Sequence, residues 1–524
     1  MKKSVQVLLA SLLMCSGWIN SAHAQLLSLE QLEQESVCYS VDRAARDPEE
    51  ILRLQVLRRA YSFPSAIVHL KPLQWLTMNH TLVESVPDRI ANLQQLQVLE
   101  LRGNKLKVLP DAVGQLKALR RLDVSKNYLT ELPALDALVN LEWLILSKNE
   151  SLDTLPSSVF TRAQLQRLDV SRVKLQHFPN SVEQLNKLVE LDLSSNKLTT
   201  IPATIGSLKQ LQQLRLGDNP VAKPASIDSW LTKLPQLLEL DVAALELKQF
   251  PTAIGNMSAI RSLDASLNQF STIPASLWEL TALERLDLGA NQIDSIPPTL
   301  GQLTQLEYLN LERNEFTNLP ASIGALQQLK ILKIGVNRLQ NLPSTLGELL
   351  NLEQLYLSNT GVRRLPSSIQ NLKQLKELHI GFNKYWQVSK DASALSELKQ
   401  LERLEMNESR HKSIPVALCD LPQLKIWNLR DNQLKQLPAE IGQLSTLEEL
   451  DLRYNELTSL PDSIGSLTNL VSLNLGYNQL KTLPASIQNL KNLKKLRLER
   501  NQLSEEAQAE IKAWLPNTKI IFKH

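Results

Sequence analysis

Leucines recur through most of the chain at a spacing of 23 residues. The unit that begins at Leu283 follows a pattern that can be written LxxLxLxxNxLxxLPxxIGxL, and the same classes of residue return from Leu306. Nineteen units keep this pattern, the last beginning at Leu493, and a degenerate unit begins at Ile51. Repetition at this period predicts an array of stacked, similar structural units rather than several unrelated domains.

Each unit is predicted to contain one short strand and one turn that recurs from repeat to repeat. In the LxL segment apolar and polar residues alternate, so the leucines face inward and the residue between them faces outward. The asparagine that follows is expected to bond backbone groups of its own and the adjacent turn, forming a ladder. Thr81, Thr360 and Ser409 are partial substitutes, whereas Val173 and Leu245 are predicted to mark weak rungs. Fourteen units keep the asparagine: Asn104, Asn127, Asn149, Asn196, Asn219, Asn268, Asn291, Asn314, Asn337, Asn383, Asn432, Asn455, Asn478 and Asn501.

The side opposite the strands is predicted to consist of short turns or 3₁₀ segments. Proline fixes φ and removes a hydrogen-bond donor, and few residues then remain before the next strand. Two units are longer, with 26 residues, and begin at Leu211 and Leu375. They lack the LPxxIG segment and have room for a helix.

The pattern resembles the leucine-rich repeat family, in the LPxxIG form common in bacterial exported proteins and in Ras-group-related proteins of plants and animals. The resemblance covers residues 51–503 in about 20 units. It implies an α/β fold: a right-handed solenoid, or horseshoe, with a parallel concave sheet and short turns or 3₁₀ segments on the convex side. Open ends of such a stack need caps, and we assign residues 25–50 to an N-terminal helical cap with a helix at 42–46. Residues 504–524 are assigned to a C-terminal cap helix and strand, with Ser504 as the helix cap.

Residues 1–24 have the features of a signal peptide. Lys2 and Lys3 precede an apolar run, and Ala22 and Ala24 provide the small residues that favour cleavage before Gln25. The sequence therefore predicts an exported protein, periplasmic or secreted. The apolar run is about half the length that a membrane-spanning helix needs, and no later stretch reaches it. A lipoprotein anchored at Cys15 is the weaker alternative, because Met14 stands where a small residue is expected.

Charge and motifs exclude several classes of function. Without Lys2 and Lys3 the chain holds 55 basic and 54 acidic residues, so no global field favours nucleic acid. None of the seven histidines forms a metal-binding pair, and no phosphate-binding or nucleophile motif occurs. We therefore expect no catalytic residues, no metal site and no cofactor.

Two sets of outward residues are candidates for contact with a partner. The first is an acidic stripe that includes Asp192, Asp241 and Asp264. It suits a cationic partner or divalent ions, although Asp can also be simply tolerated on a solvent-facing strand. The second is an apolar and aromatic cluster, which suits a protein interface. The alternative for its members Phe382 and Trp386 is packing beneath the longer unit. The cluster consists of Tyr308, Ile331, Val336, Tyr356, His379, Phe382, Tyr385 and Trp386.

The predicted function is that of a non-enzymatic, exported scaffold that binds a protein partner on its concave face. Binding of a glycan or envelope polymer is an alternative, since exposed aromatic platforms beside Asp and Asn would also serve it. A secreted, host-directed effector is a third possibility. The sequence identifies neither the partner nor the oligomeric state.

Overall fold

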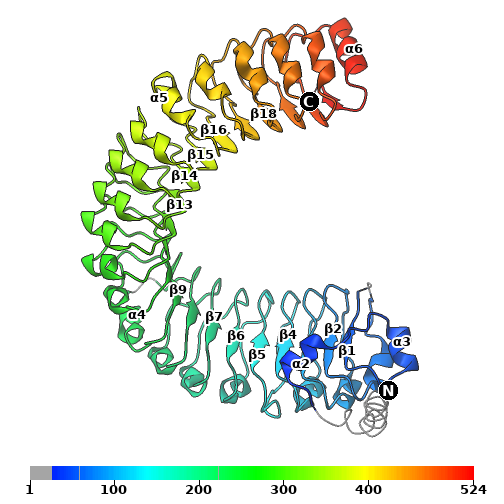
Figure 1. Cartoon of the computed structure of the whole chain (residues 1–524). Coiled ribbons are helices and arrows are strands. Elements are labelled where there is room, and N and C mark those ends of the chain that lie inside the picture. Colours follow the sequence, from blue (N-terminus) through cyan, green and yellow to red (C-terminus); the bar gives the residue numbers. More distant parts are fainter. Residues whose placement is uncertain (1–25, 58–59, 222–223, 524) are drawn as a thin grey trace, which may run out of the picture. The chain divides into compact units, whose positions relative to one another are not determined.

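The computed structural model describes residues 26–57, 60–221 and 224–523, without the side chains of residues 224–226 (Figure 1). The predicted signal peptide, residues 1–24, lies outside the described residues. The described chain forms two compact units, divided between Glu246 and Leu247.

The first unit begins with two short helices, α2 (Leu29–Gln34) and α3 (Val41–Arg46), and continues as a stack of parallel strands. Its strands are β1 (Arg53–Gln55), β2 (Trp75–Thr77), β3 (Val98–Glu100), β4 (Arg121–Asp123), β5 (Trp143–Ile145), β6 (Arg167–Asp169), β7 (Glu190–Asp192), β8 (Gln213–Arg215) and β9 (Glu239–Asp241). Its other elements are the 3₁₀ helices η2 (Ser65–His69), η3 (Asp88–Asn92), η4 (Asp111–Gln115), η5 (Ser157–Thr161), η6 (Asn180–Gln184) and η7 (Ala203–Ser207), and α4 (Pro224–Leu231).

The second unit is built in the same way and ends with α6 (Glu505–Trp514) and one further strand. Its strands are β10 (Ser262–Asp264), β11 (Arg285–Asp287), β12 (Tyr308–Asn310), β13 (Ile331–Lys333), β14 (Gln354–Tyr356), β15 (Glu377–His379), β16 (Arg403–Glu405), β17 (Ile426–Asn428), β18 (Glu449–Asp451), β19 (Ser472–Asn474), β20 (Lys495–Arg497) and β21 (Lys519–Ile521). Its 3₁₀ helices are η8 (Thr252–Asn256), η9 (Ala275–Glu279), η10 (Pro298–Gln302), η11 (Ala321–Ala325), η12 (Ser344–Glu348), η13 (Ser367–Asn371), η14 (Val416–Cys419), η15 (Ala439–Gln443), η16 (Asp462–Ser466) and η17 (Ala485–Asn489), and α5 (Val388–Leu395) lies between η13 and η14.

Within each unit, consecutive strands pair in parallel and in register, and the strands line one side of the stack (Figure 1). The central residue of a strand faces the core: Leu286 stands beside Leu309, and both are fully buried. Proline fixes the entry to nearly every 3₁₀ helix, as Pro297 does for η10. The predicted leucine-rich solenoid of parallel strands alternating with 3₁₀ segments is confirmed.

The asparagine ladder is present and has the predicted partners. The Asn478 side-chain amide donates to the carbonyl oxygens of Leu475 and Leu452, each at 3.0 Å, so it joins its own turn to the preceding one. Its side-chain oxygen accepts from the backbone N–H of Leu457 at 3.0 Å. Each such residue satisfies buried backbone groups that the short strands leave unpaired.

A left-handed residue precedes every ladder position of the nineteen regular units. Only Gly103 among these residues is a glycine, so the other turns hold a residue with a Cβ in a conformation that favours glycine. A second left-handed residue follows four of the ladder positions that lack asparagine: Leu82 after Thr81, Lys174 after Val173, Glu246 after Leu245 and Arg410 after Ser409. The weak rungs at Val173 and Leu245 stay a prediction, and the strained second residue is a cost that they share with Thr81 and Ser409.

The two 26-residue units contain the predicted helices, α4 and α5. At α5 a buried carboxylate organises the longer turn. Asp391 accepts from the indole N–H of Trp386 and the backbone N–H of Leu365, each at 2.8 Å, and from Arg364 at 2.6 Å. The charge of Asp391 is therefore compensated where it lies buried.

Helices also lie beside the first and last strands. In the first unit α2 starts with a capping box between Ser28 and Gln31, and buries Leu32. In the second unit the hydroxyl of Ser504 accepts from the N–H of Ala507, which confirms the predicted cap of α6. α6 buries Ile511, and β21 adds to β20.

Candidate functional site

The strands of the second unit present two outward columns of side chains, because each three-residue strand buries its central residue. The first outward column holds the residue before the buried one, as Tyr308 on β12, and the second holds the residue after it, as Lys333 on β13. Register pairing places members of a column on neighbouring strands about 4.8 Å apart. Residues 23 positions apart therefore lie side by side and can form continuous surfaces.

Five such side chains form one continuous stack, which we call the cation–aromatic stack: Arg285, Tyr308, Lys333, Tyr356 and His379. The Arg285 guanidinium lies 3.6 Å from the centre of the Tyr308 ring. The Lys333 ammonium lies 5.7 Å from that ring and 4.9 Å from the Tyr356 ring. The rings of Tyr356 and His379 stack at 4.2 Å with only 9° between their planes. Each cation–ring contact of this kind contributes roughly 0.5–1 kcal/mol at an exposed site.

Hydrogen bonds fix the polar ends of the stack. The Tyr308 hydroxyl donates to Asp287 at 3.2 Å, and the His379 ring nitrogen Nε2 lies 3.1 Å from a Glu377 oxygen. Burial, and then the neighbouring Asp287 carboxylate, raises the pKa of Tyr308 to about 12, so its hydroxyl remains a donor at neutral pH. Burial and Glu377 also raise the pKa of Tyr356. The stack is thus ordered before any partner binds.

The structure divides the rest of the predicted aromatic cluster. Ile331 lies half-buried in the first outward column, beside Tyr308. Val336 and Phe382 occupy left-handed turn positions with φ of 51° and 60°, at the end of the strands rather than on them. Phe382 is 41% exposed and Tyr385, beyond it, is 68% exposed. These residues form the edge of the surface and not its centre.

Trp386 does not belong to this surface. Its side chain is only 4% exposed, its N–H donates to Asp391, and its ring meets His411 edge-on at 5.4 Å. The prediction of an exposed indole was wrong because Trp386 has a buried carboxylate partner and packs beneath the longer unit.

The acidic residues have a local structural role. Asp192 in the first unit accepts from both the backbone N–H and the hydroxyl of Ser194, at 2.9 and 2.6 Å. Asp264 in the second unit bonds Ser266 in the same way, and Asp241 in the first unit accepts from the N–H of Ala243. Each carboxylate therefore closes the end of its own strand. Burial raises the pKa of Asp192 and of Asp264 above the ordinary aspartate value.

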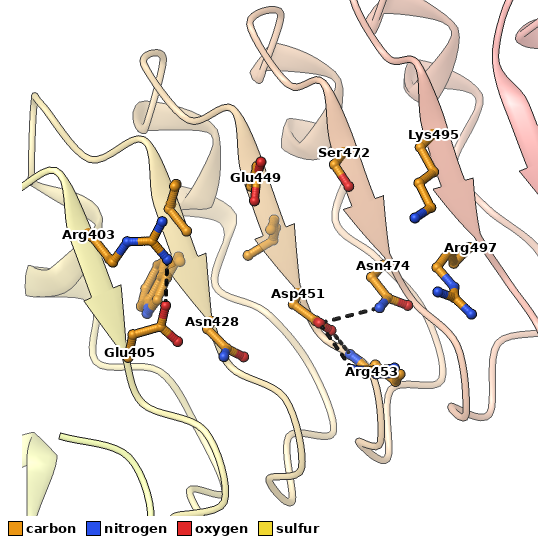
Figure 2. Close-up of a pocket in the computed structure, with 13 residues that line it drawn as sticks. Arg403, Glu405, Asn428, Glu449, Asp451, Arg453, Ser472, Asn474, Lys495 and Arg497 are labelled. Atoms are coloured by element: carbon orange, nitrogen blue, oxygen red, sulfur yellow. Dashed lines mark hydrogen bonds and ion pairs between the residues drawn. The ribbon is translucent and has the colours of Figure 1, made fainter. Parts of the chain in front are cut away.

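A hollow of about 340 Å³ over β16–β20 was not predicted from the sequence. Figure 2 shows charged and amide side chains from five consecutive strands around it, among them Arg403, Glu449, Asp451, Lys495 and Arg497. The sequence does contain these charged and amide residues. Their grouping becomes visible only when the outward positions of several adjacent repeats are compared.

No group of three or more His, Cys, Asp or Glu side chains that could hold a metal ion occurs among the described residues. Cys38 and Cys419 are both buried free thiols, and burial raises the pKa of Cys419 to about 12. Among the helices described, none is both long and apolar enough to cross a bilayer.

Comparison with known proteins supports the repeat architecture. A family model described as a leucine-rich repeat region matches residues 51–146, 126–264, 294–419 and 404–513. No curated protein matches the chain in sequence.

Three solved structures illustrate the structural similarity. The ectodomain of the receptor kinase GASSHO1/SCHENGEN3 from Arabidopsis thaliana, in complex with CASPARIAN STRIP INTEGRITY FACTOR 2, is 26% identical, with a TM-score of 0.71 over 91% of this chain and 59% of that one. The plant peptide hormone receptor RGFR1 in complex with RGF2 is 25% identical, with a TM-score of 0.55 over 93% and 87%. The functional domain of InlJ from Listeria monocytogenes is 21% identical, with a TM-score of 0.53 over 74% of each chain. The chain spans only about 59% of the first of these proteins.

Proposed function

The chain belongs to the leucine-rich repeat family, and on that basis we propose that it is a non-enzymatic scaffold that binds a protein or peptide partner on the outward face of its second unit. The centre of the proposed contact is the cation–aromatic stack on β11–β15. A rigid, ordered set of aromatic and cationic side chains suits an interface, since little side-chain entropy is lost when a partner binds. Two similar solved structures, at 26% and 25% identity, are a receptor kinase ectodomain in complex with CASPARIAN STRIP INTEGRITY FACTOR 2 and a peptide hormone receptor in complex with RGF2, which supports the same class of partner.

One observation favours a protein partner over the alternative of a glycan. Sugar rings bind aromatic side chains by stacking on an open ring face. Here Arg285 and Lys333 lie over the Tyr308 ring, and Lys333 and His379 lie over the Tyr356 ring. The accessible parts of the stack are therefore ring edges, hydroxyl groups and cations, which suit the polar and apolar groups of a protein surface.

The experiment compares capture of a partner by the mature chain and by a variant with Tyr308→Ala and Tyr356→Ala. The two substitutions remove three cation–ring contacts of roughly 0.5–1 kcal/mol each, so we expect a modestly lower melting temperature with the chain still folded, and loss of the partner from crosslinked envelope extracts. Tyr128→Ala in the first unit is the matched control, because it removes an exposed tyrosine outside the stack. Unchanged capture by the double variant would refute the proposed contact, and binding to a polysaccharide array that the same variant loses would favour the glycan.

We also propose that the protein is exported, into the periplasm or beyond the cell, after cleavage before Gln25. The support is the basic, apolar and small-residue order of residues 1–24. Fractionation and N-terminal sequencing of the full-length product test this: we expect a mature protein that begins at Gln25 outside the cytoplasm. An uncleaved cytoplasmic product would contradict export, and release into the medium would favour the secreted effector over a periplasmic scaffold.

A further inference from the structure

Three neighbouring strands of the second unit carry acidic, neutral and basic residues at matching outward positions. The register pairs Glu449 with Ser472 and Ser472 with Lys495, and places Asp451, Asn474 and Arg497 in the same order. The residues just before these strands repeat the order once more. We call this surface the charged trough, and it consists of Glu448, Glu449 and Asp451 at β18, Val471, Ser472 and Asn474 at β19, and Lys494, Lys495 and Arg497 at β20.

The two ends of the trough differ in how much of their charge is already paired. At one end Asp451 accepts from Asn474 at 3.3 Å and lies 3.7 Å from Arg453, and Arg497 pairs with the buried Glu499 at 2.9 Å. At the other end the charges are free for a partner. Among residues 26–523 as described, no ion pair involves the four exposed residues Glu448, Glu449, Lys494 and Lys495.

Lys425 does not remove this free acidic charge. It lies on the neighbouring repeat, and its ammonium group donates to Glu402 at 2.8 Å. That hydrogen bond and the charge of Glu402 raise the pKa of Lys425 most, and the more distant Glu448 carboxylate adds to the shift. Glu448 and Glu449 therefore remain an exposed acidic pair, opposite the exposed basic pair Lys494 and Lys495.

The neutral side chains on β19 are shorter than the charged side chains on either side of them. Glu449, Ser472 and Lys495 all line the hollow of about 340 Å³ that extends over β16–β20 (Figure 2). Glu448, Val471 and Lys494 line a second hollow of about 500 Å³. Because the walls are two strand spacings apart, they are separated by roughly 10 Å. That width is sufficient for one extended polypeptide to lie along β19 with its side chains directed at both walls.

We propose that the charged trough binds an extended segment of a protein partner in which basic and acidic residues alternate. Side chains of an extended chain point alternately to opposite sides, at about 3.4 Å per residue. A segment lying along β19 would then direct its basic residues to Glu448 and Glu449 and its acidic residues to Lys494 and Lys495. A segment of one charge would be repelled by one wall. This inference rests on the proposed function only in taking the partner to be a protein.

The first test measures binding of two synthetic octapeptides to the mature chain at low ionic strength, by fluorescence anisotropy. One alternates lysine and glutamate, and the other has the same composition in two blocks. We expect the alternating peptide to bind about tenfold more tightly, from several weak ion pairs acting together, and to lose that advantage in high salt. Equal binding of the two peptides would overturn the proposal.

The second test changes one wall. Lys494→Glu with Lys495→Glu makes both walls acidic, so we expect at least a tenfold loss of the alternating peptide and tighter binding of an all-lysine octapeptide. Lys107→Glu with Lys117→Glu in the first unit is the matched control, because it changes two exposed lysines and the net charge identically. An equal loss of the alternating peptide in this control would show that its binding does not depend on the trough and would overturn the proposal.

A second copy of the chain is the other candidate occupant. The trough would be self-complementary under a two-fold axis parallel to β19 between the two facing surfaces, with each acidic wall facing a basic wall. Sedimentation velocity at low salt distinguishes this case: self-association that the wall variant abolishes would assign the trough to a homodimer and refute the peptide proposal. The proposed function has a separate readout, since it depends on capture of the native partner by the cation–aromatic stack.

Discussion

Acidification is expected to weaken the second unit through one buried histidine. His411 is 6% exposed, and burial lowers its pKa from 6.5 to about 4. Above pH 6.5 the imidazole is neutral in both the folded and the unfolded chain, so it adds no penalty. Between pH 6.5 and pH 4 the unfolded chain gains a proton that the folded chain does not, and the free energy of unfolding falls. The full effect is about 3 kcal/mol, of which about 2 kcal/mol is lost by pH 5.

Hydrogen exchange measures this loss where it arises, which is useful because a repeat protein of this length need not unfold in one step. Amides of β16 and β17 should lose about 2 kcal/mol of protection between pH 7 and pH 5, after correction for intrinsic exchange rates. His411→Phe keeps a ring against Trp386 but cannot titrate, and should abolish most of that change. Strands β4 and β5 of the first unit serve as internal controls. The same pH dependence in the variant, or an imidazole that titrates near 6.5 by NMR, would refute the assignment.

Three further predictions follow from buried polar groups. Asn478→Ala removes a side chain with four backbone partners and should cost roughly 2–4 kcal/mol, detected as lost amide protection in the adjoining repeats while distant ones stay protected. Asp391→Ala leaves the N–H groups of Leu365 and Trp386 buried without their acceptor and should cost roughly 3–5 kcal/mol, visible as a lower denaturation midpoint with a change in indole fluorescence; an unchanged midpoint would contradict the network. The Cys419 thiol should resist alkylation at pH 8 in the folded protein and react after unfolding, and equal labelling in both states would contradict its raised pKa.

The fold could be predicted from the sequence because each repeat states the same pattern again. The alternation in LxL predicts the strand, the asparagine predicts the ladder, and the proline predicts the 3₁₀ side, so that one atypical unit does not obscure the others. The longer units were also predictable, since without LPxxIG they had length for α4 and α5. The second left-handed residue at Lys174 was not, because it arises where Val173 provides no amide to the turn.

The candidate site could be predicted only in part. Spacing of 23 residues places Tyr308, Tyr356 and His379 on one face, but the positions of Arg285 and Lys333 over the rings depend on side-chain conformation. The repeat spacing also could not show whether the aromatic side chains of the irregular loop before α5 point to solvent or to the core. Pairing with Asp391 directs Trp386 into the core and leaves Tyr385 outside.

The ladder also bears on how a chain of this kind can change its length during evolution. Most rungs are asparagines that donate to the turn before them through the same side-chain amide, so duplicating or deleting a whole asparagine repeat by recombination restores equivalent bonds. The longer units show where extra residues can be accommodated: Gln213 still pairs with Glu239, and Glu377 with Arg403, across the insertions that contain α4 and α5. Gain or loss of whole repeats can therefore lengthen or shorten the row of outward side chains while the buried leucine core keeps the same packing.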